Sequence, residues 1–140
     1  MIQVIAGNKG TGKTKKLIEM TNAAAESEKG LVVFVDDDKR YMFDLKHEVR
    51  FVDAGEFAGI CGNGTDVFLG FLSGMLSVNF DISLICIDAF KKLTGAQDIS
   101  ATELFFKRLA ALSESTKCNF IVNISCEMTE LPAYVAQFAI

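Results

Sequence analysis

Several kinds of residue are scarce in this sequence, and each scarcity limits the kinds of site that it can form. The chain has no tryptophan, one proline and one histidine in 140 residues. The histidine, His47, lies in a polar stretch, and we interpret it as a surface residue. The cysteines show no C-x-x-C spacing and no nearby pair of histidines, which argues against a zinc or redox centre. They are Cys61, Cys86, Cys118 and Cys126. We expect reduced thiols and a cytoplasmic protein.

Long apolar runs and an excess of positive charge are also missing. The longest apolar run, Val67 to Val78, is interrupted by glycine and serine. It is shorter than the ~20 residues that span a bilayer, so we predict no membrane span. A net charge of -4 and a pI near 5.0 argue against sequence-independent binding to nucleic acid. Because the first strand is expected to begin at residue 2, we also expect no signal peptide.

Apolar residues are abundant, and their arrangement predicts the fold. Half of the chain is hydrophobic, with 12 phenylalanines, and we find no linker, repeat or low-complexity tract. We therefore predict a single domain over residues 1–140. Expected strands and helices alternate, which favours an α/β fold with a mostly parallel sheet of about five strands and helices on both faces. The strands are expected at 1–6, 31–35, 49–52, 82–88 and 119–125. The main helices are expected at 15–28, 66–78 and 100–117, with Ser100 as the cap of the third. We also expect a polar loop at 91–98 and a short helix or edge strand after Pro132.

The expected helix over residues 66–78 is apolar around most of its circumference. Thr65–Asp66 is suited to cap its start. Either burial on more than one side, or a surface for a homo-oligomer or a protein partner, would account for this composition. We interpret Gly70 and Gly74 as residues that let the helix approach a sheet closely. The glycine-rich stretch 53–64 before it is predicted to be an irregular loop, either a mobile lid or a connector.

A glycine-rich loop separates the first expected strand from the first expected helix. Its 8 residues match the pattern G-x-x-x-x-G-K-[ST] at every fixed position. Glycines let the backbone approach a ligand and adopt unusual dihedral angles, so that N–H groups can surround phosphates. The helix that follows adds further N–H groups and the positive end of its dipole. The loop consists of Gly7, Asn8, Lys9, Gly10, Thr11, Gly12, Lys13 and Thr14.

The side chains of this loop have distinct expected tasks. Lys13 would place its ammonium on the β- and γ-phosphates of a nucleotide, and the Thr14 hydroxyl would ligate Mg²⁺. Lys9 is an additional cation, which either helps to bind phosphate or faces solvent. A second motif, the stretch Ile82 to Asp88, is an apolar strand that ends in an aspartate.

With these two motifs the chain resembles the P-loop NTPase superfamily, in which they are called Walker A and Walker B. The resemblance implies a three-layer P-loop NTPase fold, binding of ATP or GTP with Mg²⁺, and Asp88 as the carboxylate beside the metal. More narrowly, the chain is similar to short bacterial P-loop proteins that are labelled ATP-binding or twitching-motility-like. ATP is favoured over GTP because no N-K-x-D segment occurs late in the chain.

Efficient hydrolysis would also need a group that activates water. Many related ATPases place a glutamate after the Walker B aspartate, but Ala89 and Phe90 stand there. By the same resemblance, Asp36 at the end of the strand 31–35 is the candidate catalytic base, and a solvated turn is the alternative interpretation. Glu127 is a spare candidate.

Three functions fit these observations. The first is Mg²⁺-dependent ATP binding with slow ATP hydrolysis, in which Lys13 and the loop amides position and neutralise the phosphates. The second is a small-molecule kinase of the nucleoside or nucleotide type, with acceptor contacts from 38–40 or 53–64. The third is a non-hydrolysing module whose affinity for a partner responds to nucleotide. Asn123 and Ser125 lie where related ATPases sense the γ-phosphate, although polar strand ends are common.

Overall fold

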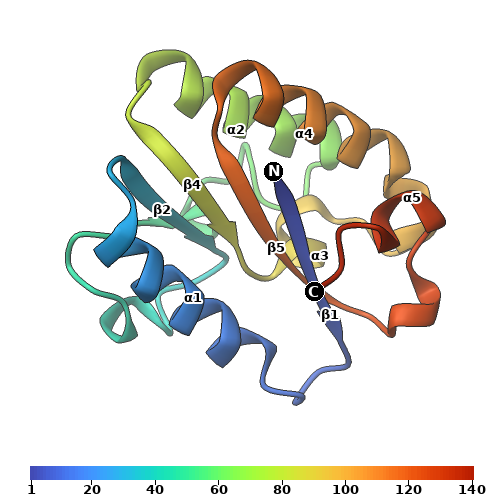
Figure 1. Ribbon diagram of the computed structural model, residues 1–140. Helices are drawn as coiled ribbons and strands as arrows, with labels where there is room; N and C mark the ends of the chain where they lie inside the picture. The colour runs from blue at the N-terminus through green and yellow to red at the C-terminus, as the bar shows by residue number, and fades with distance from the viewer.

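The computed structural model describes residues 1–140 and contains one sheet of five strands, all parallel (Figure 1). The strand order is β1-β5-β4-β2-β3, so β5 separates β1 from β4. The predicted α/β class and the mostly parallel sheet of about five strands are confirmed. The strands are β1 (Ile2–Gly7), β2 (Leu31–Asp36), β3 (Arg50–Asp53), β4 (Ile82–Ile87) and β5 (Asn119–Ser125).

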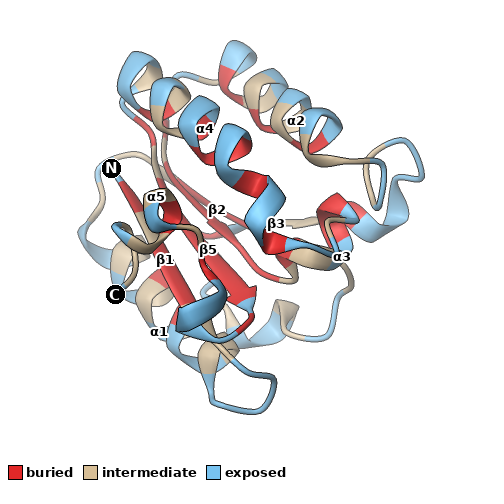
Figure 2. Cartoon of the chain, turned by 90° about the vertical axis from the view of Figure 1, so that its right-hand side faces the viewer, coloured by how far each residue is buried: buried red, intermediate tan, exposed pale blue.

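Helices cover both faces of the sheet. Helix α1 lies against one face, and α2 and α4 lie side by side against the other (Figure 1). Leu17 of α1 belongs to an apolar cluster with Phe34 and Cys86, whereas Phe68 of α2 and Ile85 belong to a larger cluster on the opposite face. Figure 2 shows buried residues along the strands and along the inner sides of these helices. The helices are α1 (Lys13–Ser27), α2 (Thr65–Val78), α3 (Phe90–Thr94), α4 (Glu103–Thr116) and α5 (Ala133–Ala136).

Helix α2 buries one side rather than most of its surface. Phe68, Leu72 and Leu76 are buried at helical spacing. Gly70 and Gly74 lie on the exposed side, and a Cβ added at either would find no atom within 4 Å. The interpretation that these glycines allow close approach to a sheet is therefore wrong, as is the expectation of burial on several sides.

Two helices begin differently from the prediction. Helix α2 follows Gly64, and Thr65–Asp66 form its first turn without a side-chain cap. Helix α4 follows a 3-10 turn over Ile99–Thr102, in which the Asp98 carboxylate accepts a hydrogen bond from the Ser100 N–H at 3.0 Å. Asp98 therefore caps the 3-10 turn, because its carboxylate can reach the N–H two residues ahead. Helix α4 itself begins after Thr102 without a side-chain cap, so the prediction of Ser100 as its cap is wrong.

The segment 91–98, predicted to be a polar loop, is partly helical. Phe90 and Leu93 are spaced by three residues, so both side chains of α3 can point into the same core. Both are fully buried, and the Phe90 ring centroid lies 5.3 Å from that of Phe105 on α4. The short helix therefore fixes the chain that follows β4.

The glycine-rich loop before α2 is bonded to α3. The Gly62 N–H donates to the Leu93 carbonyl at 2.9 Å, and the Gly64 N–H donates to the Thr94 carbonyl at 2.8 Å. The Cys61 Sγ lies 3.6 Å from the Lys92 carbonyl. These contacts favour the interpretation of this stretch as a connector over that of a mobile lid.

The end of the chain pairs with the edge strand β1. The Val4 N–H donates to the Phe138 carbonyl at 2.8 Å, and the Ile140 N–H donates to the Val4 carbonyl at 3.0 Å. Helix α5 follows Pro132, so of the two predicted alternatives, a short helix or an edge strand, the helix forms there. None of the helices has the length and apolar character needed to cross a bilayer.

Candidate functional site

A row of three buried polar side chains crosses the middle of the sheet at the carboxyl ends of its strands. Val35 of β2 pairs with Ile87 of β4, and Ile87 pairs with Val122 of β5. The residues that follow these three, Asp36, Asp88 and Asn123, therefore lie level with one another. The exposed fractions of Asp36, Asp88 and Asn123 are 2%, 7% and 3%. Residues two positions earlier on each strand belong to the apolar cluster on the α1 face, so the row continues that face toward the start of α1.

The predicted phosphate loop connects β1 to α1 and lies next to this row. Gly10 and Gly12 have φ of 88° and 82°, a region that favours glycine. The Asn8 carbonyl accepts hydrogen bonds from the Thr11 hydroxyl at 2.8 Å and the Lys13 ammonium at 3.2 Å. Gly12 precedes α1 and offers no capping side chain, so N–H groups of the first turn remain available to an anion.

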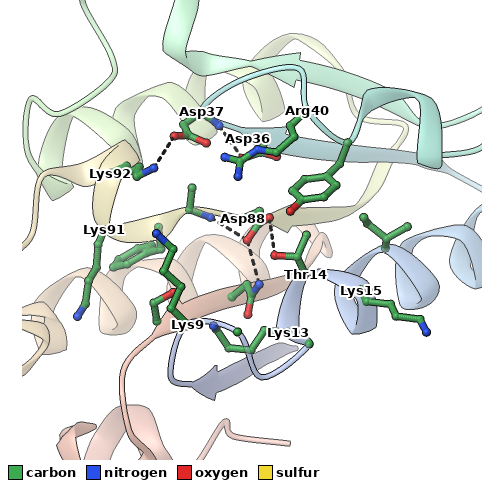
Figure 3. A pocket seen from close by; sticks show the side chains of 18 of the residues that line it. Lys9, Lys13, Thr14, Lys15, Asp36, Asp37, Arg40, Asp88, Lys91 and Lys92 are labelled. Carbon is green, nitrogen blue, oxygen red and sulfur yellow. Dashed lines mark hydrogen bonds and ion pairs between the residues drawn. The ribbon is translucent and has the colours of Figure 1, made fainter.

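Thr14 joins the loop to the buried row. Its hydroxyl donates to Asp88 Oδ2 at 3.2 Å, and the Asn123 Nδ2 donates to Asp88 Oδ1 at 2.9 Å. The Ala89 N–H also donates to Asp88 Oδ1 at 2.9 Å, with Ala89 in a left-handed conformation at φ 55°. Asp88 is therefore held by groups from α1, β5 and the backbone of the next residue, and it lies directly beside the loop (Figure 3).

Asp36 has fewer partners than Asp88. Its Oδ1 accepts a hydrogen bond from the Asp37 N–H at 2.8 Å, while its buried Oδ2 has no partner, and neither has Oδ1 of Asp37. Burial, together with the neighbouring Asp37 carboxyl and the charge of Asp88, raises the pKa of Asp36 to about 8. With this pKa, a large share of the Asp36 carboxyl would hold a proton at neutral pH, and the remainder would be ionised. A carboxyl with a pKa near the working pH is suited to general acid–base chemistry.

The loop and the buried row border one cavity of about 930 Å³. Figure 3 shows the Asp88 carboxylate with Thr14 below it and Asp36, Asp37 and Arg40 above it. Of the residues that the sequence analysis named for the site, those that line the cavity are Lys9, Gly10, Gly12, Lys13, Thr14, Asp36, Asp88, Asn123 and Ser125.

Three residues of the predicted loop do not line the cavity. Asn8 supplies the carbonyl that organises the turn, and Thr11 donates to it. A Cβ at Gly7 would lie 2.8 Å from the Thr11 hydroxyl oxygen, so a side chain at Gly7 would disturb the turn. Glu127, the spare candidate base, is exposed and accepts a hydrogen bond from Asn8 instead of lining the cavity.

The cavity also contains residues to which the sequence analysis gave no task. Tyr41 and Asp44 come from the segment after β2, and Lys91 and Lys92 come from α3. The charged residues 36–40 after the strand 31–35 could have indicated that the segment with Tyr41 and Asp44 lies near the site. Helix α3 begins at Phe90, directly after β4 and Asp88, so the sequence already places it at this edge of the sheet. The burial of Phe90 then fixes how the helix lies there.

Comparison of the sequence with models of protein families and with curated proteins found no match. The assignment of a function therefore depends on the loop motif and on the geometry of the cavity.

Proposed function

We propose that this chain is an Mg²⁺-dependent ATP-binding protein of the P-loop NTPase type, with the three-layer fold of that superfamily, and that it hydrolyses ATP slowly. One observation carries the proposal. The glycine-rich loop between β1 and α1 brings the Thr14 hydroxyl to 3.2 Å from the Asp88 carboxylate at the end of β4. Two motifs that are 74 residues apart in sequence thereby meet at one point.

The loop has the chemistry to hold a phosphate chain. Its backbone N–H groups and the start of α1 favour an anion, and Lys9 and Lys13 line the same cavity. The Lys13 ammonium, which donates to the Asn8 carbonyl at 3.2 Å, could exchange this partner for a phosphate oxygen.

The donor set also fits Mg²⁺. Thr14 and Asp88 offer a hydroxyl and a carboxylate oxygen, the hard donors that Mg²⁺ prefers. Nearby, the buried Asn123 Oδ1 has no hydrogen-bond partner and could accept one from a metal-bound water. Bound there, Mg²⁺ would neutralise charge on the phosphate oxygens. The residues that would hold it are Thr14 directly and Asp88 directly or through water.

Asp36 is the carboxyl best placed to accept a proton from water. No carboxylate follows Asp88, and Glu127 lies outside the cavity. Asp36 lines the cavity one strand away from Asp88 and has a free oxygen, Oδ2. Because its raised pKa keeps a large share of it protonated at neutral pH, hydrolysis is expected to be slow.

Phosphate release from Mg·ATP by purified protein tests this function. We expect slow turnover that Asp36→Asn lowers at least about tenfold, since one acid–base group typically contributes that much or more. Glu127→Gln, which alters a carboxyl outside the cavity, serves as the matched control and should turn over at the wild-type rate. Turnover that survives Asp36→Asn would contradict the role of Asp36. Tight ATP binding without turnover would support the nucleotide-responsive module instead.

A further inference from the structure

Two buried carboxylate oxygens at the end of β2 have no hydrogen-bond donor. They are Oδ2 of Asp36, a residue with an exposed fraction of 2%, and Oδ1 of Asp37. A buried carboxylate oxygen without a donor costs free energy, and neighbouring carboxylates also repel each other. A cation that contacts both oxygens would remove both costs. The end of β2 therefore has the features of a cation site.

Three consecutive carboxylates are close enough to share one ion. One carboxylate oxygen from each of Asp36, Asp37 and Asp38 lies within 4.8 Å of the other two. Two ligands of one ion can be no farther apart than twice its ligand distance, which gives ~4.6–5.2 Å for Ca²⁺ and ~4.0–4.2 Å for Mg²⁺. The three oxygens thus fit an ion of the size of Ca²⁺. Water molecules would complete the set of about six to eight oxygens that Ca²⁺ takes.

Backbone contacts hold the three carboxylates in place. Asp36 ends β2, which lies between β4 and β3 in the sheet. The Asp37 N–H donates to Asp36 Oδ1 at 2.8 Å, and the Arg40 N–H donates to Asp38 Oδ1 at 2.9 Å. Gly55 lies so close to the Asp37 carbonyl that an added Cβ would clash with its oxygen. The turn after β2 is therefore fixed by the fold itself.

The protein's own cations nearby bind other oxygens of these carboxylates. The Lys92 ammonium lies 3.6 Å from Asp37 Oδ2, and the Arg40 guanidinium donates to Asp38 Oδ2 at 2.9 Å. Both cationic side chains are more than half exposed, so solvent weakens their effect on the buried oxygens. Asp36 and Asp37 line the cavity, which gives an ion a route to them (Figure 3).

We propose that Asp36 and Asp37, with Asp38 as a third ligand, bind a hard divalent cation of the size of Ca²⁺. Carboxylate oxygens are the ligands that this class of ion prefers. The site is separate from the proposed Mg²⁺ site, whose ligands are Thr14 and Asp88. An ion at the new site would bind the Asp36 oxygen that the proposed hydrolysis uses to accept a proton. It would therefore slow turnover, a consequence that rests on the proposed function.

Calorimetric titration of Ca²⁺ into the protein without nucleotide tests the site. We expect saturable binding with a dissociation constant at or below about 1 mM. Asp37→Asn keeps the shape of the side chain but removes its charge, and it should weaken binding at least about tenfold. Two controls should bind Ca²⁺ within about twofold of wild type. Thr14→Val removes the expected Mg²⁺ ligand of the loop, and Asp44→Asn removes an exposed carboxylate that lines the cavity outside the cluster.

Phosphate release from Mg·ATP at increasing Ca²⁺ concentration tests the effect on turnover. Ca²⁺ also binds ATP, but it does so equally whichever protein is present. The comparison of wild type with Asp37→Asn therefore isolates the effect of the site. We expect Asp37→Asn to need at least about threefold more Ca²⁺ for half inhibition. Equal inhibition of the two proteins would overturn the link between the site and hydrolysis.

The binding outcomes separate this inference from the proposed function. Saturable binding that Asp37→Asn weakens and both controls keep would support the site. No saturable binding below about 10 mM Ca²⁺, or equal binding by wild type and Asp37→Asn, would overturn the inference and leave the ATP site untouched. Binding that Thr14→Val abolishes would place the ion at the loop and would also overturn it. If Ca²⁺ binds as expected but ATP is not hydrolysed, the cation site stands and the proposed hydrolysis fails.

Discussion

Asp36 combines deep burial with a carboxylate oxygen that no protein group contacts. Its exposed fraction is 2%, and its Oδ2 has no hydrogen-bond partner. Asp88, one strand away, is equally enclosed but accepts three hydrogen bonds. Asp88 has partners that stabilise its charge, as expected of a carboxylate beside a metal, whereas Asp36 has few, as expected of a proton-transfer group.

The buried Asp36 carboxyl should make stability depend on pH. Its folded pKa of about 8 exceeds the value near 3.9 of an unfolded chain, so the unfolded state binds fewer protons between these pH values. The contribution of Asp36 to the free energy of unfolding is fully present below about pH 4 and is lost as pH rises through about 8. Asn at this position does not titrate. We expect the stability of Asp36→Asn relative to wild type to increase by at least about 1 kcal/mol between pH 5 and pH 8.5.

Urea unfolding of both proteins at these two pH values measures this difference. Glu127→Gln, an exposed carboxyl change, should show no such trend. A stability difference between Asp36→Asn and wild type that is the same at both pH values would contradict the raised pKa.

At the scale of elements, α3 connects the candidate site to the exposed surface. Its Lys91 and Lys92 line the cavity, and its end is bonded to the loop 57–64. Cys61 lies in that loop and is the one cysteine that is not buried. Burial raises the pKa of the Cys86 and Cys118 thiols to about 12, which makes them unreactive.

Cys61 should therefore report on ligand binding. In the native protein we expect a water-soluble thiol reagent to modify one cysteine, and Cys61→Ser to abolish this reaction. A ligand that contacts Lys91 and Lys92 should hold α3 and its bonded loop more tightly, so saturating Mg·ATP should slow the reaction at least about threefold. Reaction of several thiols in the native state, or a rate that is unchanged by ATP, would count against this connection.

At the scale of the whole molecule, the sequence predicted the local parts of the site better than their assembly. The loop from Gly7 to Thr14 could be placed because one strand, one turn and one helix are contiguous in the chain. The strand order could not be read, because it depends on pairing between distant segments. The row of Asp36, Asp88 and Asn123 follows from that order, as β5, β4 and β2 are neighbours.

The remaining errors have a similar origin. A short segment such as Phe90–Thr94 carries too few residues for a helical period to stand out, and its apolar pair is buried only because α2 and α4 lie above it. The apolar composition of α2 suggested burial on several sides, yet the sheet and α4 cover only one. The segment that brings Arg40, Tyr41 and Asp44 to the cavity is held by hydrogen bonds of Asn22 to residues more than 20 positions away, which no local pattern indicates.

The central claim is that the loop between β1 and α1 binds the phosphates of ATP. An equilibrium titration of ATP in the presence of Mg²⁺ tests it most directly, with wild type, Lys13→Ala and Lys16→Ala. Lys16 is the matched control, because it is an exposed lysine of the same helix that does not line the cavity. We expect Lys13→Ala to weaken ATP binding at least about tenfold and Lys16→Ala to change it less than about twofold. Equal affinity of wild type and Lys13→Ala, or no binding by wild type, would contradict the account.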